Sequence, residues 1–541
     1  MINMAMKRFI RPIIILTACS ALFSACQGSS PYSDSQQLFI GDDIAIASTQ
    51  YGKVKGFILN DVYTFLGIPY GASTAGEARF LPPQEPEPWE GILPTVFYGD
   101  SAPQNTDGKY PNSYSTFTDH WNYYDVSEDC LRLNVWTPGI SDGAKRPVLV
   151  WLHGGGFTAG NGIEQDGYNG ENLSREGDIV FVSLNHRLGP IGFSDFSAVD
   201  KKYSDSGNVG ILDIVAALKW VHANIAEFGG DPDNVTIMGQ SGGGAKVCTL
   251  VAMNETAGLI HKAVALSGNI TSAIDHNYSS ELGKYICERA GGMNALLKMP
   301  WKEYIDFANA AASEFNRTYS NGMMRGSFGP VGDGFHIPMG TFYSDVASPS
   351  NSIPMIFCST TAERGISRYN AALEEMDKEE AIQFINQTRQ TTSGEAIFNA
   401  YNKVFSGLKP VDVVNMAIST REGVISSANA KSVQDAPIYV AWFGWNPPLF
   451  DGRMKAFHCL DICFWFKNTD LMLTHTGGGP RPRALSDKMS AALLAFMRTG
   501  DPNVKSLPKW KAYTPDEGAT MILNDKCSLL MDPDKEARII K

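Results

Sequence analysis

The chain has 541 residues, of which 43% are hydrophobic and 19% are charged. These proportions describe a globular protein and exclude a coiled coil or a disordered chain, while the length leaves open one large α/β enzyme or several domains. The formal net charge is −12, and lysine and arginine form no sustained run, which argues against nucleic acid as a partner.

The N-terminal segment, residues 1–25, has the composition of an export signal. Three basic residues precede an apolar run over 12–25, which is too short to span a bilayer and has the length of the apolar part of a signal peptide. These basic residues are Lys7, Arg8 and Arg11. We therefore expect the protein to be exported.

A cysteine ends this run in a sequence similar to a bacterial lipobox, Phe23-Ser24-Ala25-Cys26. Leu16-Thr17-Ala18-Cys19 fits the lipobox consensus better, but only about seven apolar residues precede it, the lower limit for a signal. We expect a lipid on Cys26 to anchor the protein to the bacterial membrane, at the periplasmic face or the cell surface. A cleaved signal without a lipid, and hence a secreted protein, is the alternative. Residues 27–37 are polar and rich in serine, which is typical of a flexible tether, and we expect this tether to cover residues 26–41.

Seven of the nine cysteines follow Cys26. Their spacing shows no paired framework and no C-x-x-C, so we expect neither a disulfide scaffold nor a metal site. Cys459 and Cys463 lie four residues apart and could meet, but buried free thiols are the expected state.

Polar and apolar residues alternate over 42–66, which predicts an antiparallel meander of strands. Residues 101–126 form a long segment rich in aromatic residues. Such a loop indicates either the lip of a pocket or a loop held by its own aromatic side chains. Residues 127–138 then predict another strand.

The first chemical element follows a nearly continuous apolar run over 147–152, as expected of a strand buried on both faces. The run ends in His153-Gly154-Gly155-Gly156-Phe157. Glycines at a strand end let backbone N–H groups converge on one point, which is the arrangement of an oxyanion hole. A strand over 179–189 and a helix over 211–228 follow, and a strand–helix–strand unit predicts parallel pairing in an α/β sheet.

A strand over 235–238 leads into Gly239-Gln240-Ser241-Gly242-Gly243, after which a helical pattern begins. A serine between two glycines in this context is typical of a nucleophile elbow, a turn so sharp that side chains on the glycines would collide with neighbouring elements. A glycine-rich loop with an incidental serine is the alternative. A phosphate-binding loop is excluded, because Lys246 comes one position late and Val247 replaces the residue that binds magnesium.

Several long segments resemble, in sequence order, the type B carboxylesterases, a family that includes the cholinesterases and the bacterial para-nitrobenzyl esterases. They include GIPYG (67–71), SEDCLRLNVWTP (127–138), HGGGF (153–157), NHRLGPIGF (185–193) and GNVGILDIVAALKWVHANIAEFGGDPDNVTIMGQSGGG (207–244). The resemblance implies an α/β-hydrolase fold, with a mostly parallel central sheet flanked by helices, an N-terminal antiparallel meander, and inserted helices and loops over the site. It covers residues 42–541, which we expect to form a single catalytic domain.

The resemblance also implies a triad in the order nucleophile, acid, histidine. Ser241 is the expected nucleophile, Glu363 follows a strand as the acid of the family does, and His458 lies in AFHCLDICFWF, which is similar to the histidine loop of the family. Asp461, three residues beyond His458, is the rival acid. The expected oxyanion hole consists of the N–H groups of Gly155, Gly156 and Gly242.

Two further residues are expected near the site. Ser267 resembles a family serine that supports the acid, with ordinary packing as the alternative, and Phe157 is expected beside the pocket. Gln240 departs from the family, in which glutamate commonly precedes the nucleophile, and the missing charge argues against a cationic substrate. Cys130 lacks the upstream cysteine that relatives carry, so their disulfide should be absent.

Together these residues predict a serine hydrolase that cleaves carboxylic esters through an acyl-enzyme. The expected partner is a small-molecule ester, and the chemistry needs neither a metal nor a cofactor. The triad does not select the leaving group, so an amidase, a thioesterase or a peptidase is the alternative. Non-catalytic adhesion relatives have lost the serine, which is present here.

Overall fold

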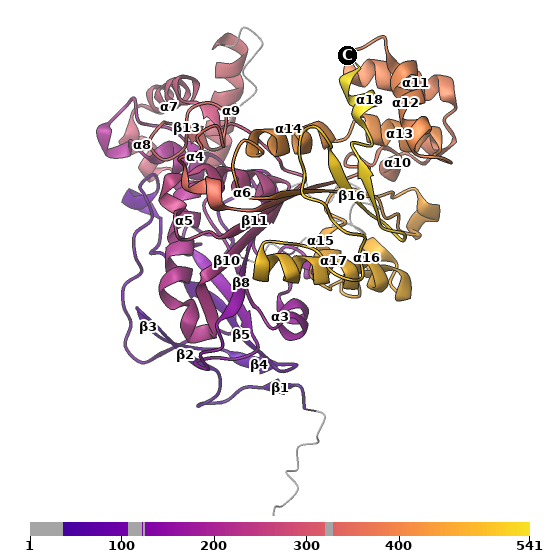
Figure 1. The fold of residues 1–541 in the computed structure, drawn as a ribbon. Coiled ribbons are helices and arrows are strands. Elements are labelled where there is room, and N and C mark those ends of the chain that lie inside the picture. Colours follow the sequence, from indigo (N-terminus) through magenta and orange to yellow (C-terminus); the bar gives the residue numbers. More distant parts are fainter. Residues whose placement is uncertain (1–35, 107–121, 123–124, 320–327, 541) are drawn as a thin grey trace, which may run out of the picture.

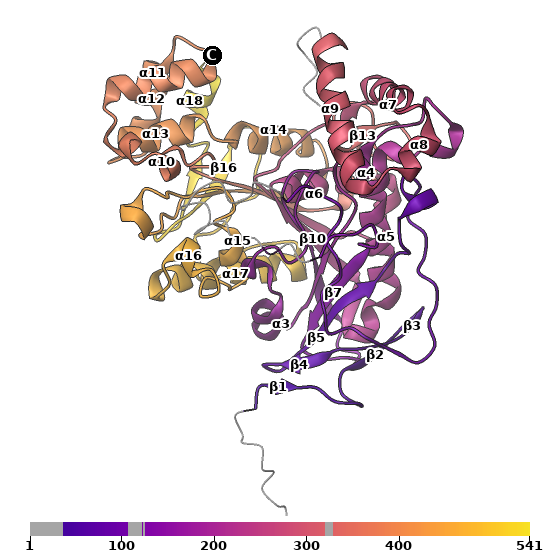
Figure 2. The same cartoon turned by 180° about the vertical axis from the view of Figure 1, so that it is seen from behind.

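The computed structural model describes residues 36–106, 122, 125–319 and 328–540. The predicted signal peptide, Cys26 and most of the aromatic segment 101–126 therefore lie outside the described residues. The described chain forms a twelve-stranded central sheet with helices on both faces (Figures 1 and 2). In order across the sheet, the strands are β1 (Leu38–Phe39), β4 (Phe57–Leu59), β5 (Val62–Pro69), β7 (Arg132–Thr137), β9 (Val180–Leu184), β8 (Arg146–Leu152), β10 (Gly230–Gln240), β11 (Lys262–Leu266), β14 (Met355–Thr360), β15 (Ile438–Phe443), β16 (Ala519–Leu523) and β17 (Ser528–Met531).

The centre of this sheet is parallel and both of its edges are antiparallel. The block from β9 to β16 pairs in parallel throughout, whereas β7, β5, β4 and β1 on one side and β17 on the other pair antiparallel. β1 lies inside the segment predicted as a tether and pairs with β4. The predicted α/β-hydrolase fold class, with a parallel centre flanked by helices, is confirmed.

The predicted meander over 42–66 is divided between two sheets. β2 (Ile46–Thr49) and β3 (Gly52–Lys55) form a separate three-stranded sheet with β6 (Ile92–Pro94), whereas β4 and β5 join the central sheet. The chain changes sheet at Gly56, where a Cβ atom would lie 2.0 Å from the Thr64 carbonyl oxygen. Only glycine fits so close an approach. This contact is made between neighbouring strands and not along one strand, so alternation along the sequence predicted one continuous meander.

Successive residues of the parallel strands pack into two hydrophobic cores, one on each face of the sheet. In β8, Val148 and Val150 face the core that includes α5 (Val209–Asn224) and α6 (Gly242–Ala252). Leu149 and Trp151 face the core that includes α3 (Glu171–Gly177) and α17 (Pro480–Thr499). A side-chain period of two puts neighbours on opposite faces, which explains the continuous apolar run in the sequence.

The helix predicted over 211–228 is observed as α5 followed by a short 3₁₀ turn, Ile225–Phe228. It ends at Gly229, whose φ of 72° is a left-handed conformation that favours glycine. The run over 201–228 has the length and mean hydropathy of a membrane-crossing helix, but 72% of its apolar window is buried inside the protein. It is the core helix that leads into β10.

Two groups of inserted helices follow the carboxyl ends of parallel strands and lie on opposite sides of the molecule (Figures 1 and 2). After β11 come α7 (His276–Ala290), α8 (Met293–Lys298) and α9 (Trp301–Tyr319); after β14 come α10 (Ile366–Tyr369), α11 (Lys378–Arg389), α12 (Gly394–Val404) and α13 (Pro410–Ala417). The next helix, α14 (Arg421–Lys431), lies between the two groups and packs on the sheet against β14 and β15 (Figure 1). The shorter elements are α4 (Gly189–Phe193), β12 (Ile274–Asp275), β13 (Val331–Gly332), α15 (Ile462–Trp465), α16 (Leu473–Thr476) and α18 (Lys535–Ile539). In open α/β sheets, ligands bind at this carboxyl edge.

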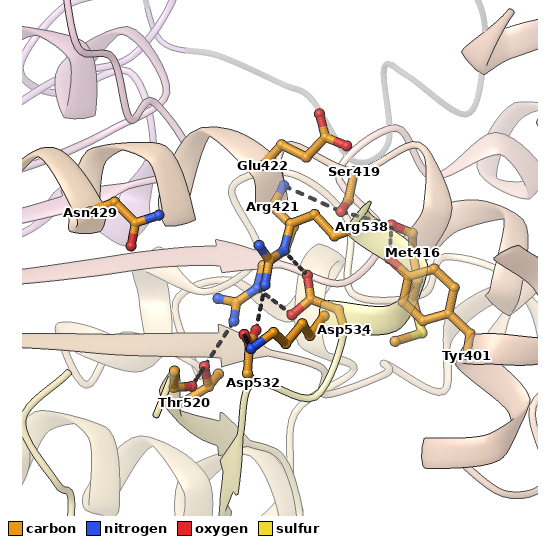
Figure 3. Close-up of polar contacts among 12 residues, drawn as sticks. Tyr401, Met416, Ser419, Arg421, Glu422, Asn429, Thr520, Asp532, Asp534 and Arg538 are labelled. Atoms are coloured by element: carbon orange, nitrogen blue, oxygen red, sulfur yellow. Dashed lines mark hydrogen bonds and ion pairs between the residues drawn. The ribbon is translucent and has the colours of Figure 1, made fainter. Parts of the chain in front are cut away.

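A buried charged network attaches the C-terminal segment to the sheet (Figure 3). The Arg421 guanidinium, from α14, has Nε 3.3 Å from an Asp534 carboxylate oxygen and donates to Thr520 Oγ1 of β16 at 2.8 Å. It also lies 5.0 Å from the centre of the Trp442 ring. Arg538 of α18 donates to the second Asp534 oxygen at 3.1 Å. Arg421 and Asp534 are both only 2% exposed, so their pairing decides the stability of this region.

Replacing Asp534 with asparagine should lower the free energy of unfolding by about 3–5 kcal/mol, because Arg421 then keeps a buried charge without its carboxylate. The matched control is Glu536→Gln, two residues after Asp534, which breaks the exposed pair between Lys403 of α12 and Glu536 of α18 and should cost no more than about 1 kcal/mol. Urea unfolding followed by tryptophan fluorescence measures both. Equal losses in the two variants would contradict the role given to the buried pair.

Candidate active site

Ser241 stands in a sharp turn between β10 and α6, with φ 58° and ψ −124°. A serine rarely adopts this conformation, and it persists only where the surroundings impose it. A Cβ on Gly239 would lie 2.4 Å from the Gly243 backbone, and one on Gly242 would lie 2.0 Å from the Gly156 carbonyl oxygen. The flanking glycines are therefore required by close backbone approach, as the sequence predicted for an elbow.

The glycine turn after β8 lies directly against this elbow. Gly155 and Gly156 have φ of 76° and 63°, and the carbonyl of Gly156 is the atom that a side chain at Gly242 would strike. The structure thus brings together the three glycines predicted as an oxyanion hole. None of their three N–H groups has a protein acceptor within the described part of the chain. Phe157, which follows, packs edge-on against Phe193 with ring centres 5.5 Å apart.

Glu363 and His458 come from loops after β14 and β15, which the backbone holds together. The Ala362 N–H donates to the Ala456 carbonyl at 3.2 Å, and Ala362 forms a bridge with Phe457. As a result His458 Nδ1 donates to Glu363 Oε2 at 2.5 Å. The other Glu363 oxygen accepts from Ser267 Oγ at 2.6 Å and from the Thr360 N–H at 2.7 Å.

Glu363 and His458 each stabilise the charged form of the other. Burial alone would raise the pKa of Glu363, but the His458 charge and the hydrogen bonds from His458, Ser267 and Thr360 outweigh it and lower the pKa. Burial alone would lower the pKa of His458, but the neighbouring Cys459 and the negative charge of Glu363 outweigh it and raise the pKa well above the ordinary value. The Glu363 carboxylate therefore favours the charged form of His458.

The Gln240 amide lies against the imidazole of His458. Its Nε2 is 3.2 Å from Nδ1 and 3.3 Å from Nε2 of the ring, and an atom equally near to both nitrogens at this range sits over the ring face. Gln240 Oε1 accepts from the Cys459 thiol at 3.1 Å. No hydrogen bond joins the Ser241 hydroxyl to the ring among the described residues, and such bonds are often absent before substrate binds. Sequence analysis assigned no role at the site to Cys459, although its position next to His458 was a signal.

Asp461, the rival acid, is fully buried and makes no hydrogen bond to His458 among the described residues. Its Oδ2 accepts instead from the Trp465 indole N–H at 3.4 Å. Burial, with a contribution from the Glu363 charge, raises the pKa of Asp461 to about 7. The structure thus gives the contact with the imidazole to Glu363.

The remaining candidate groups lie elsewhere. His336 contacts the Glu255 carboxylate at 2.7 Å and lines two cavities, of about 500 and 210 Å³, that include none of the predicted site residues. The seven cysteines of the described chain are free thiols, and five of them are buried. Within the same residues, no cluster of three or more histidine, cysteine or acidic side chains could hold a metal ion.

A serine on a strand–turn–helix elbow at the carboxyl edge of a parallel sheet, with a carboxylate–histidine pair beside it, defines an α/β hydrolase. The chain belongs to the carboxylesterase family, whose family model matches residues 43–538. It is therefore a carboxylic ester hydrolase.

Relatives of known activity match over almost their whole length. The para-nitrobenzyl esterase of Bacillus subtilis is 31% identical over 497 residues, which cover 91% of this chain and 97% of that protein. A solved esterase of Clostridium hathewayi superimposes with a TM-score of 0.81 at 31% identity, covering 93% of this chain and 98% of the other. A solved carboxylesterase of Geobacillus stearothermophilus gives 0.72 at 30% identity, covering 91% and 99%.

Proposed function

We propose that this ester hydrolase uses Ser241 as nucleophile, His458 as general base and Glu363 as the acid that orients the base. The observation that carries the proposal is the 2.5 Å contact between His458 Nδ1 and Glu363 Oε2 beside the elbow. With Nδ1 bonded to a carboxylate, Nε2 is the ring nitrogen left to take the serine proton. Ser267 and the Thr360 N–H hold the far side of Glu363 and so fix the direction of the pair.

The reaction then follows in two halves. Ser241 Oγ attacks the ester carbonyl carbon as His458 takes its proton, and the new oxyanion accepts hydrogen bonds from the N–H groups of Gly155, Gly156 and Gly242. The tetrahedral intermediate collapses, the alcohol leaves with the proton from His458, and an acyl-enzyme remains. Water, deprotonated by His458, releases the acid and restores Ser241.

We propose neutral esters as the substrates. The residue against the imidazole is an amide rather than a carboxylate, so the site has no negative charge there to attract a cation.

A para-nitrophenyl ester and the matching para-nitroanilide distinguish esterase activity from amidase activity. We expect kcat/KM to be at least about 10²-fold higher for the ester than for the anilide, where each factor of ten corresponds to about 1.4 kcal/mol. Preference for the anilide would contradict the proposal.

Gln240→Glu should shift the acid limb of the pH–rate profile to higher pH. A carboxylate over the ring favours the charged imidazolium, which raises the pKa of His458, and the base is then protonated over a wider range. The variant should also favour a choline ester over its neutral isostere by on the order of tenfold, equivalent to about 1.4 kcal/mol. If neither the acid limb of the pH–rate profile nor the selectivity ratio changes, Gln240 does not line the substrate pocket.

We also propose that the protein is exported and anchored through a lipid on Cys26. The proposal rests on the signal-like segment 1–25 and the lipobox-like sequence at 23–26. Cys26→Ala should release the protein from membranes and abolish incorporation of radiolabelled palmitate, whereas Cys19→Ala should leave both unchanged. The reverse result would place the lipid on Cys19. If the wild-type protein incorporates no palmitate, a secreted protein without a lipid is indicated.

A further inference from the structure

Lys246 is a fully buried lysine on α6, five residues after Ser241. Its Nζ donates to the His153 carbonyl at 2.9 Å and lies 5.9 Å from the centre of the Phe157 ring. No carboxylate of the described residues is in ion-pair contact with it. A buried ammonium with one hydrogen bond is costly, and an apolar side chain of similar length would avoid that cost.

The groups that face Lys246 do not neutralise it. Burial lowers the pKa of Lys246 to about 7, while the Glu164 carboxylate acts in the opposite direction without reversing the shift. The imidazoles of His153 and His186 stack with centres 5.1 Å apart, and burial together with the Lys246 charge lowers the pKa of His186 well below its ordinary value. Lys246 thus lies near the neutral ring of His186, and no carboxylate of the described residues is in ion-pair contact with it.

Among the described residues, the hydrogen bond of Lys246 is made to the first residue of the glycine turn. His153 directly precedes the segment that presents the N–H groups of Gly155 and Gly156 to the elbow. The end of β8 presses against α6 at this point, because a Cβ on Gly243 would lie 2.0 Å from the Leu152 carbonyl oxygen and 2.9 Å from that of His153. By donating to the His153 carbonyl, Lys246 therefore fixes the peptide from which the turn departs, two residues before the first predicted oxyanion donor.

We propose that Lys246 is a positioning residue for the oxyanion hole: its ammonium holds the glycine turn through the His153 carbonyl and adds positive charge on the side where the tetrahedral intermediate becomes negative. This inference rests on the proposed function. A fixed charge in a water-excluded site acts more strongly on a developing charge than on a neutral substrate. The transition state should therefore gain more than the bound ester.

The decisive variant is Lys246→Met, with Lys431→Met as matched control. Lys431 of α14 is also fully buried and also donates from Nζ to a backbone carbonyl, that of Ser350, at 2.9 Å, but it lies outside the predicted site. Lys246→Met should lower kcat about 10- to 100-fold with KM nearly unchanged. Affinity for a trifluoromethyl ketone, which adds Ser241 to form an oxyanion, should fall by the same factor, while affinity for the matching alcohol should not.

The pH dependence of the wild-type enzyme supplies a second measurement. Loss of the Lys246 proton removes the charge, so affinity for the ketone should fall as the pH rises from about 6 to about 9, and Lys246→Arg should abolish this basic limb. A flat wild-type profile would overturn the inference. So would normal kcat in Lys246→Met, or equal losses per folded molecule in Lys246→Met and Lys431→Met.

Failure of the proposed function gives a different result. If Ser241→Ala still hydrolyses ester at a substantial rate, the nucleophile assignment fails and the inference on Lys246 fails with it. If Ser241→Ala is inactive and Lys246→Met resembles the wild type, only the inference on Lys246 is overturned.

Discussion

Ser241→Ala should lower kcat by about 10⁶-fold while KM for a neutral ester changes little. The substitution removes the only atom that forms the covalent bond and leaves the elbow intact, because alanine carries the same Cβ at φ 58°. The oxyanion hole and the pocket should remain, so a residual rate above that of water is expected. Steady-state kinetics with a para-nitrophenyl ester measure the loss, and labelling by a fluorophosphonate should disappear with it.

Ser267→Ala is the matched control for this result. It also removes one serine hydroxyl close to the site, but that hydroxyl only donates to Glu363, at 2.6 Å. The expected loss is about 10- to 100-fold, the equivalent of one hydrogen bond to a charged group. A Ser267 variant as inactive as the Ser241 variant, or a Ser241 variant that still reacts with the fluorophosphonate, would contradict the assignment of the nucleophile.

The parts of the site that could be predicted from the sequence are those whose function depends on the local backbone. The elbow requires glycine at 239 and 242 because any side chain would strike Gly243 or Gly156, and this requirement appears in the sequence as G-x-S-x-G. The same holds for the turn at Gly155 and Gly156, whose positive φ values favour glycine. Their packing against one another follows from the parallel pairing of β8 with β10. The strand–helix–strand pattern predicted a parallel sheet, but it did not predict that β8 lies between β9 and β10.

Side-chain contacts between distant loops could not be predicted in this way. The amide of Gln240 lies over His458 and accepts from Cys459 only because the loop after β15 closes on the end of β10. Sequence analysis used Lys246 only as evidence against a phosphate-binding loop. The spacing of Lys246 in the sequence does not show that its Nζ donates to the His153 carbonyl. The position of Gly56 at a change of sheet likewise depends on Thr64, eight residues later in a different strand.

The acid of the triad has two candidates within reach of His458. Glu363 makes the 2.5 Å contact with Nδ1 and is held from behind by Ser267 and Thr360. Asp461 is nearer in sequence but accepts from Trp465, and burial raises its pKa to about 7, so it is a poor stabiliser of a positive imidazole at neutral pH. The two possible assignments of the acid therefore predict opposite results when each carboxyl group is replaced by an amide.

Glu363→Gln should lower kcat by about 10⁴-fold, because the amide keeps the shape of the carboxylate but loses the charge that fixes the tautomer and stabilises the imidazolium. The acid limb of the remaining activity should move to lower pH, since the Glu363 charge is one of the causes that raise the pKa of His458. Asp461→Asn, the matched control, should lose no more than about tenfold through small shifts of its loop. Steady-state kinetics across pH decide between them: an inactive Asp461 variant beside an active Glu363 variant would reverse the assignment.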